Sequence, residues 1–231
     1  MNPDVLTVEE LARYLRRDAR EIQRLADRGY LPGRKVAGQW RFARAEILHW
    51  VETQLPSWDE QQLAQLEDRR EAEEERLVGH LLPEACVAVP LQARTKASVL
   101  SELVQLAERS WQVYDPEAIL KAVEAREAMQ PTSMPGGVAL PHPRRPLPEA
   151  LGESVIAFGR TLTPIPFGGD RGGLCDLFFL VCCRDDRTHL RVLARLARMF
   201  LKPGFLEQLR QADSPEAALQ VIAEAEQSLR K

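Results

Sequence analysis

His142 is the residue of this chain whose surroundings point most directly to chemistry. It stands in the run Gly136–Arg144, where a glycine pair and a short apolar stretch lead to Pro141, His142 and Pro143. The two prolines restrict φ on either side of the histidine, so its ring is presented from a stiff backbone. Imidazole titrates near neutral pH and can act as a nucleophile. A loop histidine can equally be a plain hydrogen-bonding group, and His142 alone does not decide between the two.

Two other side chains favour phosphoryl chemistry. Arg126 lies sixteen positions before His142, near the end of a helix-like stretch, and His189 lies forty-seven positions after it. Phosphoryl transfer to histidine needs an unprotonated nitrogen held in line and donors around the three equatorial oxygens. A guanidinium offers a planar fork that suits phosphate, and an imidazole can donate one hydrogen bond.

The segment Arg126–His142 resembles the active-site segment of enzyme IIA domains of the fructose/mannitol/nitrogen type. These domains belong to the bacterial phosphoenolpyruvate-dependent phosphotransferase system. Their pattern is Arg-Glu, a Ser/Thr-Gly stretch and then Ile-Ala-Ile-Pro-His, and this chain reads Arg-Glu to Ala-Leu-Pro-His without insertions. The helix-like run that opens at His189 is similar to the one with the family's second histidine. The resemblance covers about residues 77–229, and Pro131 and Pro135 depart from the family's glycine-rich stretch.

The resemblance implies a role for each residue. His142 would accept a phosphoryl group from the phosphorylated histidine phosphocarrier protein, without a metal or an organic cofactor. His189 would donate to the phosphoryl oxygens or fix the tautomer of its partner, and Arg126 would bind those oxygens. Thr132 matches a hydroxyl position of the family and would add a donor, with a turn-capping hydroxyl as the alternative. A transport enzyme IIA passes the group to an enzyme IIB, but nothing in this chain resembles an enzyme IIB or a membrane enzyme IIC.

Residues 5–54 predict a separate small domain. Thr7 and Glu10 form a capping-box pattern for a helix through about Leu15. A second helix is expected over 19–27, two short strands over 31–42 and a third helix over 43–54. The patterns Leu-Thr-Val-Glu-Glu-Leu-Ala, Gly-x-Leu-Pro and Gly-x-Trp-Arg-Phe resemble the excisionase/MerR-type DNA-binding domain, a helix-turn-helix with a small wing.

Basic and amide side chains of this domain suit DNA. Residues 1–50 hold ten Lys/Arg against seven Asp/Glu, although the whole chain has a formal charge of −3. An outward helix face with arginine and glutamine can read guanine and adenine in the major groove, and wing cations can contact phosphates. The alternatives are a merely solvated helix face and a module that contacts protein instead. The expected DNA-binding residues are Arg20, Gln23, Arg24, Arg34, Lys35 and Arg41.

Residues 55–80 predict a linker. Nine acidic residues fall within 52–75, among good helix formers and without glycine. Such a stretch is typical of an exposed, semi-rigid helix. Leu63, Leu66 and Leu77 give it a thin apolar stripe, so a coiled coil that forms a homodimer and a plain helical spacer both stay open.

Residues 81–231 alternate strand-like and helix-like segments, which predicts an α/β domain. Strands are expected over 86–91, 138–141, 154–159 and 174–183. Helices are expected over 96–107, 116–128, 188–201 and 215–229, the last two with start signals at Thr188 and Ser214. The resemblance further implies a mixed sheet flanked by helices, with His142 at a strand end.

Composition places the chain among globular proteins of the cytoplasm. Apolar residues make up 45% and charged residues 28%, no run reaches the ~18 apolar residues of a membrane span, and no signal peptide opens the chain. Four cysteines in apolar runs, without a CxxC pair, favour buried thiols over zinc or disulfides.

The function expected from these features is a cytoplasmic regulator linked to the phosphotransferase system. Its enzyme IIA-like domain would report the state of that system through reversible phosphorylation of His142, and residues 1–54 would bind DNA. One alternative is a plain phosphocarrier for sugar uptake whose N-terminal module contacts protein. Another is a domain that never takes phosphate, joined to a constitutive DNA-binding module. For the regulator and for the plain phosphocarrier alike, the expected chemistry is that of a phosphocarrier with a phosphohistidine intermediate.

Overall fold

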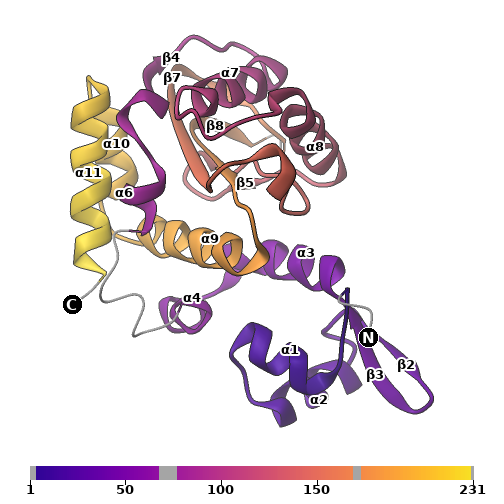
Figure 1. Ribbon diagram of the computed structural model, residues 1–231. Coiled ribbons are helices and arrows are strands. Elements are labelled where there is room, and N and C mark those ends of the chain that lie inside the picture. The colour runs from indigo at the N-terminus through magenta and orange to yellow at the C-terminus, as the bar shows by residue number, and fades with distance from the viewer. Residues whose placement is uncertain (1–3, 68–76, 169–172, 230–231) are drawn as a thin grey trace.

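The N-terminal domain is a helix-turn-helix with a two-stranded wing (Figure 1). The computed structural model describes residues 4–67, 77–168 and 173–229. The expected capping box is confirmed: Thr7 N donates to Glu10 Oε2 at 2.8 Å, and Glu10 N donates to Thr7 Oγ1 at 3.2 Å. A strand at Val5–Leu6 was not expected from the sequence; it pairs with β3 in a three-stranded sheet of order β1-β3-β2. The elements are β1 Val5–Leu6, α1 Val8–Leu15, α2 Ala19–Asp27, β2 Arg34–Val36, β3 Gln39–Ala43 and α3 Arg44–Gln54.

The C-terminal domain is built on a five-stranded sheet of order β4-β7-β8-β6-β5. The pairs β4–β7 and β6–β8 are parallel, and β7–β8 and β5–β6 are antiparallel. Helix α7 packs against β4, β7 and β8, and α9 packs against β8. The expected α/β class, with a mixed sheet flanked by helices, is therefore confirmed. The strands are β4 Val87–Leu91, β5 Ser133–Met134, β6 Val138–Ala139, β7 Val155–Pro166 and β8 Leu174–Cys182.

The central strands are apolar over the stretches where both of their faces are covered. Residues 155–159 of β7 and 177–182 of β8 are all buried. The four thiols are free and buried. Within the described residues, none of the helices combines the length and the apolar character that crossing a membrane requires.

The C-terminal helices lie close to the expected ranges, with two differences. Helix α9 begins at Asp186 instead of Thr188, because the carboxylate of Asp185 accepts from Thr188 N at 2.9 Å and is the N-cap. Helix α10 was not expected and follows Gly204, whose φ is +80°. The helices are α7 Lys96–Glu108, α8 Pro116–Met129, α9 Asp186–Phe200, α10 Phe205–Gln211 and α11 Pro215–Ser228, with 3-10 turns at Glu84–Cys86 and Pro148–Ala150.

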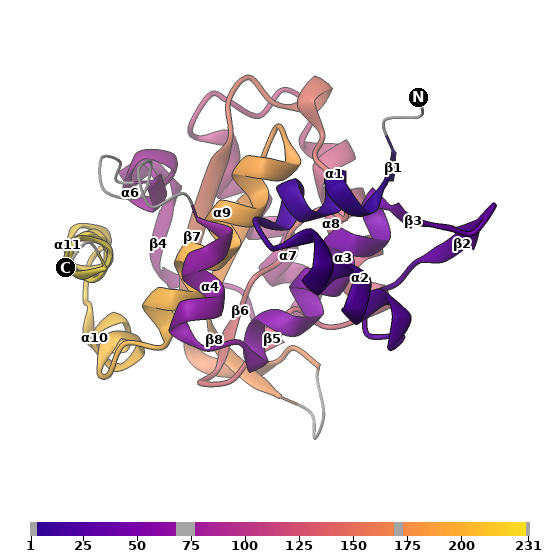
Figure 2. The same cartoon turned by 90° about the horizontal axis from the view of Figure 1, so that it is seen from below.

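The expected exposed linker helix is a wrong prediction for the part of the segment that the structure describes. After a 3-10 turn at Leu55–Ser57, helix α4 (Glu60–Leu66) lies along α9, and α6 (Leu77–Leu81) contacts α9 and α11 (Figure 2). The apolar stripe considered for a coiled coil is buried within the same chain: Leu63 is 1%, Leu66 5% and Leu77 4% exposed. Residues 68–76 of the expected helix lie outside the described residues.

Buried ion pairs hold this segment in place. Arg195 of α9, 1% exposed, contacts Glu67 Oε2 at 2.5 Å and Glu226 Oε1 of α11 at 2.8 Å. The Glu226 carboxylate also accepts from the backbone N–H groups of Val78 at 2.8 Å and Gly79 at 3.0 Å. One carboxylate thus connects α6, α9 and α11.

We expect Glu226→Ala to lower the free energy of unfolding by about 3–5 kcal/mol, because it leaves a buried guanidinium short of one partner and two N–H groups without an acceptor. The matched control is Glu224→Ala on the exposed side of the same helix, for which we expect a change within about 0.5 kcal/mol. Urea unfolding measures both. Equal midpoints for the two variants would contradict the structural role of Glu226.

Candidate functional site

The backbone around His142 is anchored to the sheet. The chain leaves β6 at Ala139, Leu140 N donates to Thr132 O at 3.1 Å, and Val181 N of β8 donates to Pro141 O at 2.9 Å. The His142 ring lies with Nδ1 2.6 Å from Leu140 O. Because a carbonyl oxygen only accepts, Nδ1 carries the hydrogen of this bond, and Nε2 is the nitrogen that faces the site.

His189 faces the same site from the first turns of α9. The two imidazole rings have centroids 5.0 Å apart. Burial lowers the pKa of His189 below its ordinary value, although its contact with Glu52 works in the opposite direction. His189 is therefore a neutral ring at neutral pH, able to donate from one nitrogen only.

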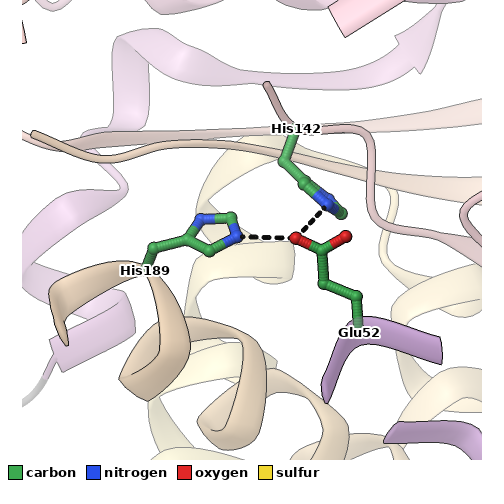
Figure 3. Close-up of side chains that lie close together, drawn as sticks. All are labelled: Glu52, His142 and His189. Atoms are coloured by element: carbon green, nitrogen blue, oxygen red, sulfur yellow. Dashed lines mark hydrogen bonds and ion pairs between the residues drawn. The ribbon is translucent and has the colours of Figure 1, made fainter. Parts of the chain in front are cut away.

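The centre of the site is Glu52, which sequence reasoning did not identify (Figure 3). Its side chain extends from α3 of the N-terminal domain and ends between the two rings. Glu52 Oε1 lies 3.1 Å from His142 Nε2 and 3.4 Å from His189 Nε2. Arg126 of α8 donates to Glu52 Oε2 from Nε at 3.0 Å and from the terminal nitrogen at 2.8 Å. All four side chains are 3% exposed.

Glu52 is ionised in this environment. Burial raises the pKa of its carboxyl, but the charge and hydrogen bonds of His142, with the bonds of His189 and His49, hold that pKa well below its usual range. The 3.1 Å contact between Oε1 and His142 Nε2 is an ion pair when that nitrogen also carries a proton. The sequence contained one signal for this residue. Glu52 lies four positions after Leu48 and three before Leu55, and this spacing places an acidic side chain on the inward face of the helix.

Thr132 is near these groups but is engaged elsewhere. Its hydroxyl donates to Glu127 Oε2 at 2.6 Å, and its backbone N–H donates to the same carboxylate. Glu127 also pairs with Lys96 at 2.9 Å. Since a hydroxyl has one hydrogen to donate, Thr132 stabilises the turn before His142 in this structure and does not donate into the site.

Glu52, His142 and His189 are also the group that could hold a metal ion. Their ligand atoms lie within 4.8 Å of one another, and two imidazoles with a carboxylate are a ligand set that zinc uses. Arg126, however, already places a guanidinium on the other oxygen of the same carboxylate. A cation would therefore bind beside a fixed positive charge, which disfavours it.

The expected DNA-binding residues gather on α2 and the wing. Asp27 joins the two elements, because Trp40 Nε1 of β3 donates to its carboxylate at 2.9 Å. Gln23 donates to the same carboxylate at 3.0 Å, and Lys35 pairs with it at 3.4 Å. The wing formed by β2 and β3 projects away from the C-terminal domain (Figure 2). Arg20, Gln23, Arg24, Arg34 and Lys35 are exposed, and Arg41 is half-buried.

Comparison with known proteins gives two family matches. The family described as "Phosphoenolpyruvate-dependent sugar phosphotransferase system, EIIA 2" matches residues 80–225, and a helix-turn-helix domain family matches residues 5–55. The first covers more than half of the chain.

Individual relatives match over the C-terminal part. The fructose-specific EIIABC component of Bacillus subtilis is 24% identical over 147 residues, which are 63% of this chain and 23% of that protein. The chain thus spans less than a quarter of that relative. The nitrogen regulatory protein of Escherichia coli strain K12 is 28% identical over 148 residues, 63% of this chain and 89% of the relative.

Solved structures agree with these matches. The nitrogen regulatory protein IIA-Ntr of Neisseria meningitidis superposes with a TM-score of 0.57 at 26% identity, covering 63% of this chain and 99% of that one. The Escherichia coli complex of enzyme IIAMtl with phosphorylated enzyme IIBMtl matches at 19% identity with a TM-score of 0.53, covering 62% of this chain and 99% of that one, and shows a shared fold.

The lowered pKa of His189 predicts a pH dependence with a definite sign. The folded protein binds this proton less tightly than the unfolded chain, so the free energy of unfolding should fall as pH drops below the ordinary histidine value of about 6.5. The loss should continue until the folded-state pKa is reached. We expect the ring protons of His189 to titrate below that value by NMR, and His189→Gln to reduce the slope, with exposed His80→Gln as the control. A midpoint at or above the ordinary value would refute the buried neutral ring.

Proposed function

We propose a function from one premise: the chain belongs to the EIIA type 2 family of the phosphoenolpyruvate-dependent sugar phosphotransferase system over residues 80–225, and carries a helix-turn-helix domain over residues 5–55. The protein is a regulator linked to that system. His142 accepts a phosphoryl group from the phosphorylated histidine phosphocarrier protein, and the resulting state modulates DNA binding by residues 1–54. We propose that the chain consists of a DNA-binding domain over residues 1–54, a connecting segment over 55–80 and an enzyme IIA domain over 81–231.

The observation that carries this proposal is the contact between the two domains at His142. Glu52 comes from the helix-turn-helix domain, and its carboxylate lies 3.1 Å from the nitrogen that would take the phosphoryl group. A change of charge at that nitrogen therefore acts directly on the DNA-binding domain. A plain phosphocarrier has no need for such a contact.

Each residue of the site has a role in the proposed transfer. The Nε2 lone pair of His142 attacks phosphorus, the bond from phosphorus to the donor's ring nitrogen breaks, and its electron pair stays with the donor ring. Arg126 balances the negative charge of the phosphoryl oxygens, and His189 donates one hydrogen bond to them. Transfer between histidines of this kind needs no metal or organic cofactor, and its partners, a phosphocarrier and DNA, place the protein in the cytoplasm.

The second candidate function is a phosphocarrier that passes the group to an enzyme IIB. The enzyme IIAMtl structure in complex with phosphorylated enzyme IIBMtl favours it for that protein. In this chain the face of His142 is covered by its own N-terminal domain, which favours the regulatory proposal.

We expect His142 to be labelled when the protein is incubated with labelled phosphoenolpyruvate and the general phosphotransferase proteins. The bond should be acid-labile and base-stable. His142→Ala should abolish labelling, and exposed His80→Ala should retain it. Arg126→Ala should slow labelling strongly while its thermal midpoint shows that the protein is still folded. Label that persists in His142→Ala, or that maps to His189, would overturn the role assignment.

We expect the full chain to bind duplex DNA with an affinity whose logarithm falls linearly with the logarithm of salt concentration, since bound phosphates release counterions. Arg20→Ala with Arg24→Ala should remove sequence preference, at about 1–3 kcal/mol for each base contact. Arg41→Ala should weaken binding to all sequences about equally. Exposed Arg94→Ala is the control. Fluorescence anisotropy at two salt concentrations measures this, and an absence of salt-dependent binding would favour a protein-contact module.

A further inference from the structure

The surface around His142 already binds an anion, and that anion is a side chain of the chain's own N-terminal domain. Arg126 donates two hydrogen bonds to Glu52 Oε2, and the two imidazole Nε2 atoms approach Oε1 at 3.1 and 3.4 Å. The phosphoryl oxygens on His142 Nε2 would require the same two donors, the guanidinium fork of Arg126 and the ring of His189. Glu52 therefore lies where those oxygens would bind.

The same contact closes the site to a donor protein. His142, His189, Arg126 and Glu52 are buried, and Figure 3 shows the carboxylate directly on the Nε2 side of the His142 ring. In-line transfer requires the donor's phosphorus to reach Nε2 from that side. While α3 is docked, a donor's phosphorus cannot reach His142 Nε2.

We propose that this surface is one binding site for two alternative partners, the Glu52-bearing helix α3 of the chain's own N-terminal domain and the phosphoryl-donating protein. Docking of the N-terminal domain and phosphorylation of His142 then exclude each other. The inference deepens the proposed function and rests on it, because it states how the phosphoryl group acts on the DNA-binding domain.

The transfer itself explains why α3 does not dock again. When α3 leaves, the lone pair of His142 Nε2 forms the bond to phosphorus as the donor's bond to phosphorus breaks, and the electron pair of that broken bond stays with the donor. The product carries about two negative charges at the place of one carboxylate. Arg126 then pairs with the phosphoryl oxygens, and Glu52 would return to a like charge in a buried site.

Release of α3 moves the whole N-terminal domain, because α3 packs into that domain's core. Its residues Ile47, Leu48 and Val51 are 0–1% exposed. Helix α3 also packs on α9, beside which Arg44 pairs with Asp186 at 3.4 Å, with side chains 36% and 16% exposed. Of these two charged contacts with the C-terminal domain, the one made by Glu52 is the more deeply buried.

Two substitutions test this inference in the full chain. Glu52→Gln keeps the size of the side chain and removes its charge, and Glu52→Ala removes the carboxylate. The matched control is Glu46→Gln on the exposed side of the same helix. Two quantities are measured for each variant: the initial rate of phosphorylation by the phosphorylated histidine phosphocarrier protein, and the rate at which diethyl pyrocarbonate modifies His142, read by peptide mass spectrometry. Thermal unfolding confirms that each variant is folded.

Both rates should rise by about tenfold or more in the Glu52 variants, since a buried charge-assisted hydrogen bond contributes at least that factor to docking. The Glu46 variant should match the unchanged protein. Equal phosphorylation and modification rates in all folded variants would overturn the inference and leave the proposed phosphorylation standing. Absence of phosphorylation in every variant, with faster His142 modification in the Glu52 variants, would overturn the proposed function and retain Glu52 docking.

One further experiment distinguishes a metal ion bound by the same three residues from docking by direct contact. If EDTA exposes His142 of the unchanged protein to modification, and added Zn²⁺ restores its protection, then Glu52, His142 and His189 form a metal site and the competition is overturned. Protection that is the same with EDTA and with Zn²⁺ supports docking by direct contact.

Discussion

The arrangement of the two domains depends on a single buried carboxylate. An ionised group that is removed from water must be paired, or it shifts its pKa and becomes neutral. Besides His49 on its own helix, Glu52 satisfies this requirement with partners from the other domain, Arg126, His142 and His189. The phosphotransferase-type site therefore helps to fix the position of α3, and with it the helix-turn-helix domain. This is a direct physical contact between that site and the helix-turn-helix domain, with no intervening element.

The charged segment between the domains strengthens this link. Glu60 and Glu67 pair with Arg198 of α9, at 2.8 and 3.0 Å. Buried ion pairs add little net stability compared with apolar contacts, but removal of one partner is costly, so they favour one geometry over its alternatives. Because α4 is also bound to α9 through Glu67, the N-terminal domain would stay attached to the C-terminal domain through this segment if α3 undocked.

The sequence allowed most of the elements and the chemistry to be predicted, because their signals are local. Capping residues, apolar strands and the Ala-Leu-Pro-His run each lie within a few residues of the feature they specify. The docking of the domains could not be predicted in this way. The acidic segment 55–80 has the composition of a solvated helix, and the partners of its buried carboxylate Glu67 are Arg195 and Arg198, more than a hundred residues later. For Glu52 the helical spacing indicates an inward position, but its partners come from three distant segments that no local pattern connects to it.

Docking and the proposed DNA binding use different faces of the N-terminal domain. Helix α3 contacts the phosphotransferase-type site, whereas α2 and the wing carry exposed Arg20, Arg24 and Arg34 and face away from it. Docking therefore does not cover α2, and the proposed switch at His142 would not act by unmasking that helix. What changes is the position of that helix relative to the rest of the chain. A single small reader makes few phosphate contacts, and sequence-specific sites of this kind are usually read by two copies in fixed register. The proposed control by phosphorylation would thus act on the geometry in which two such helices are presented to DNA.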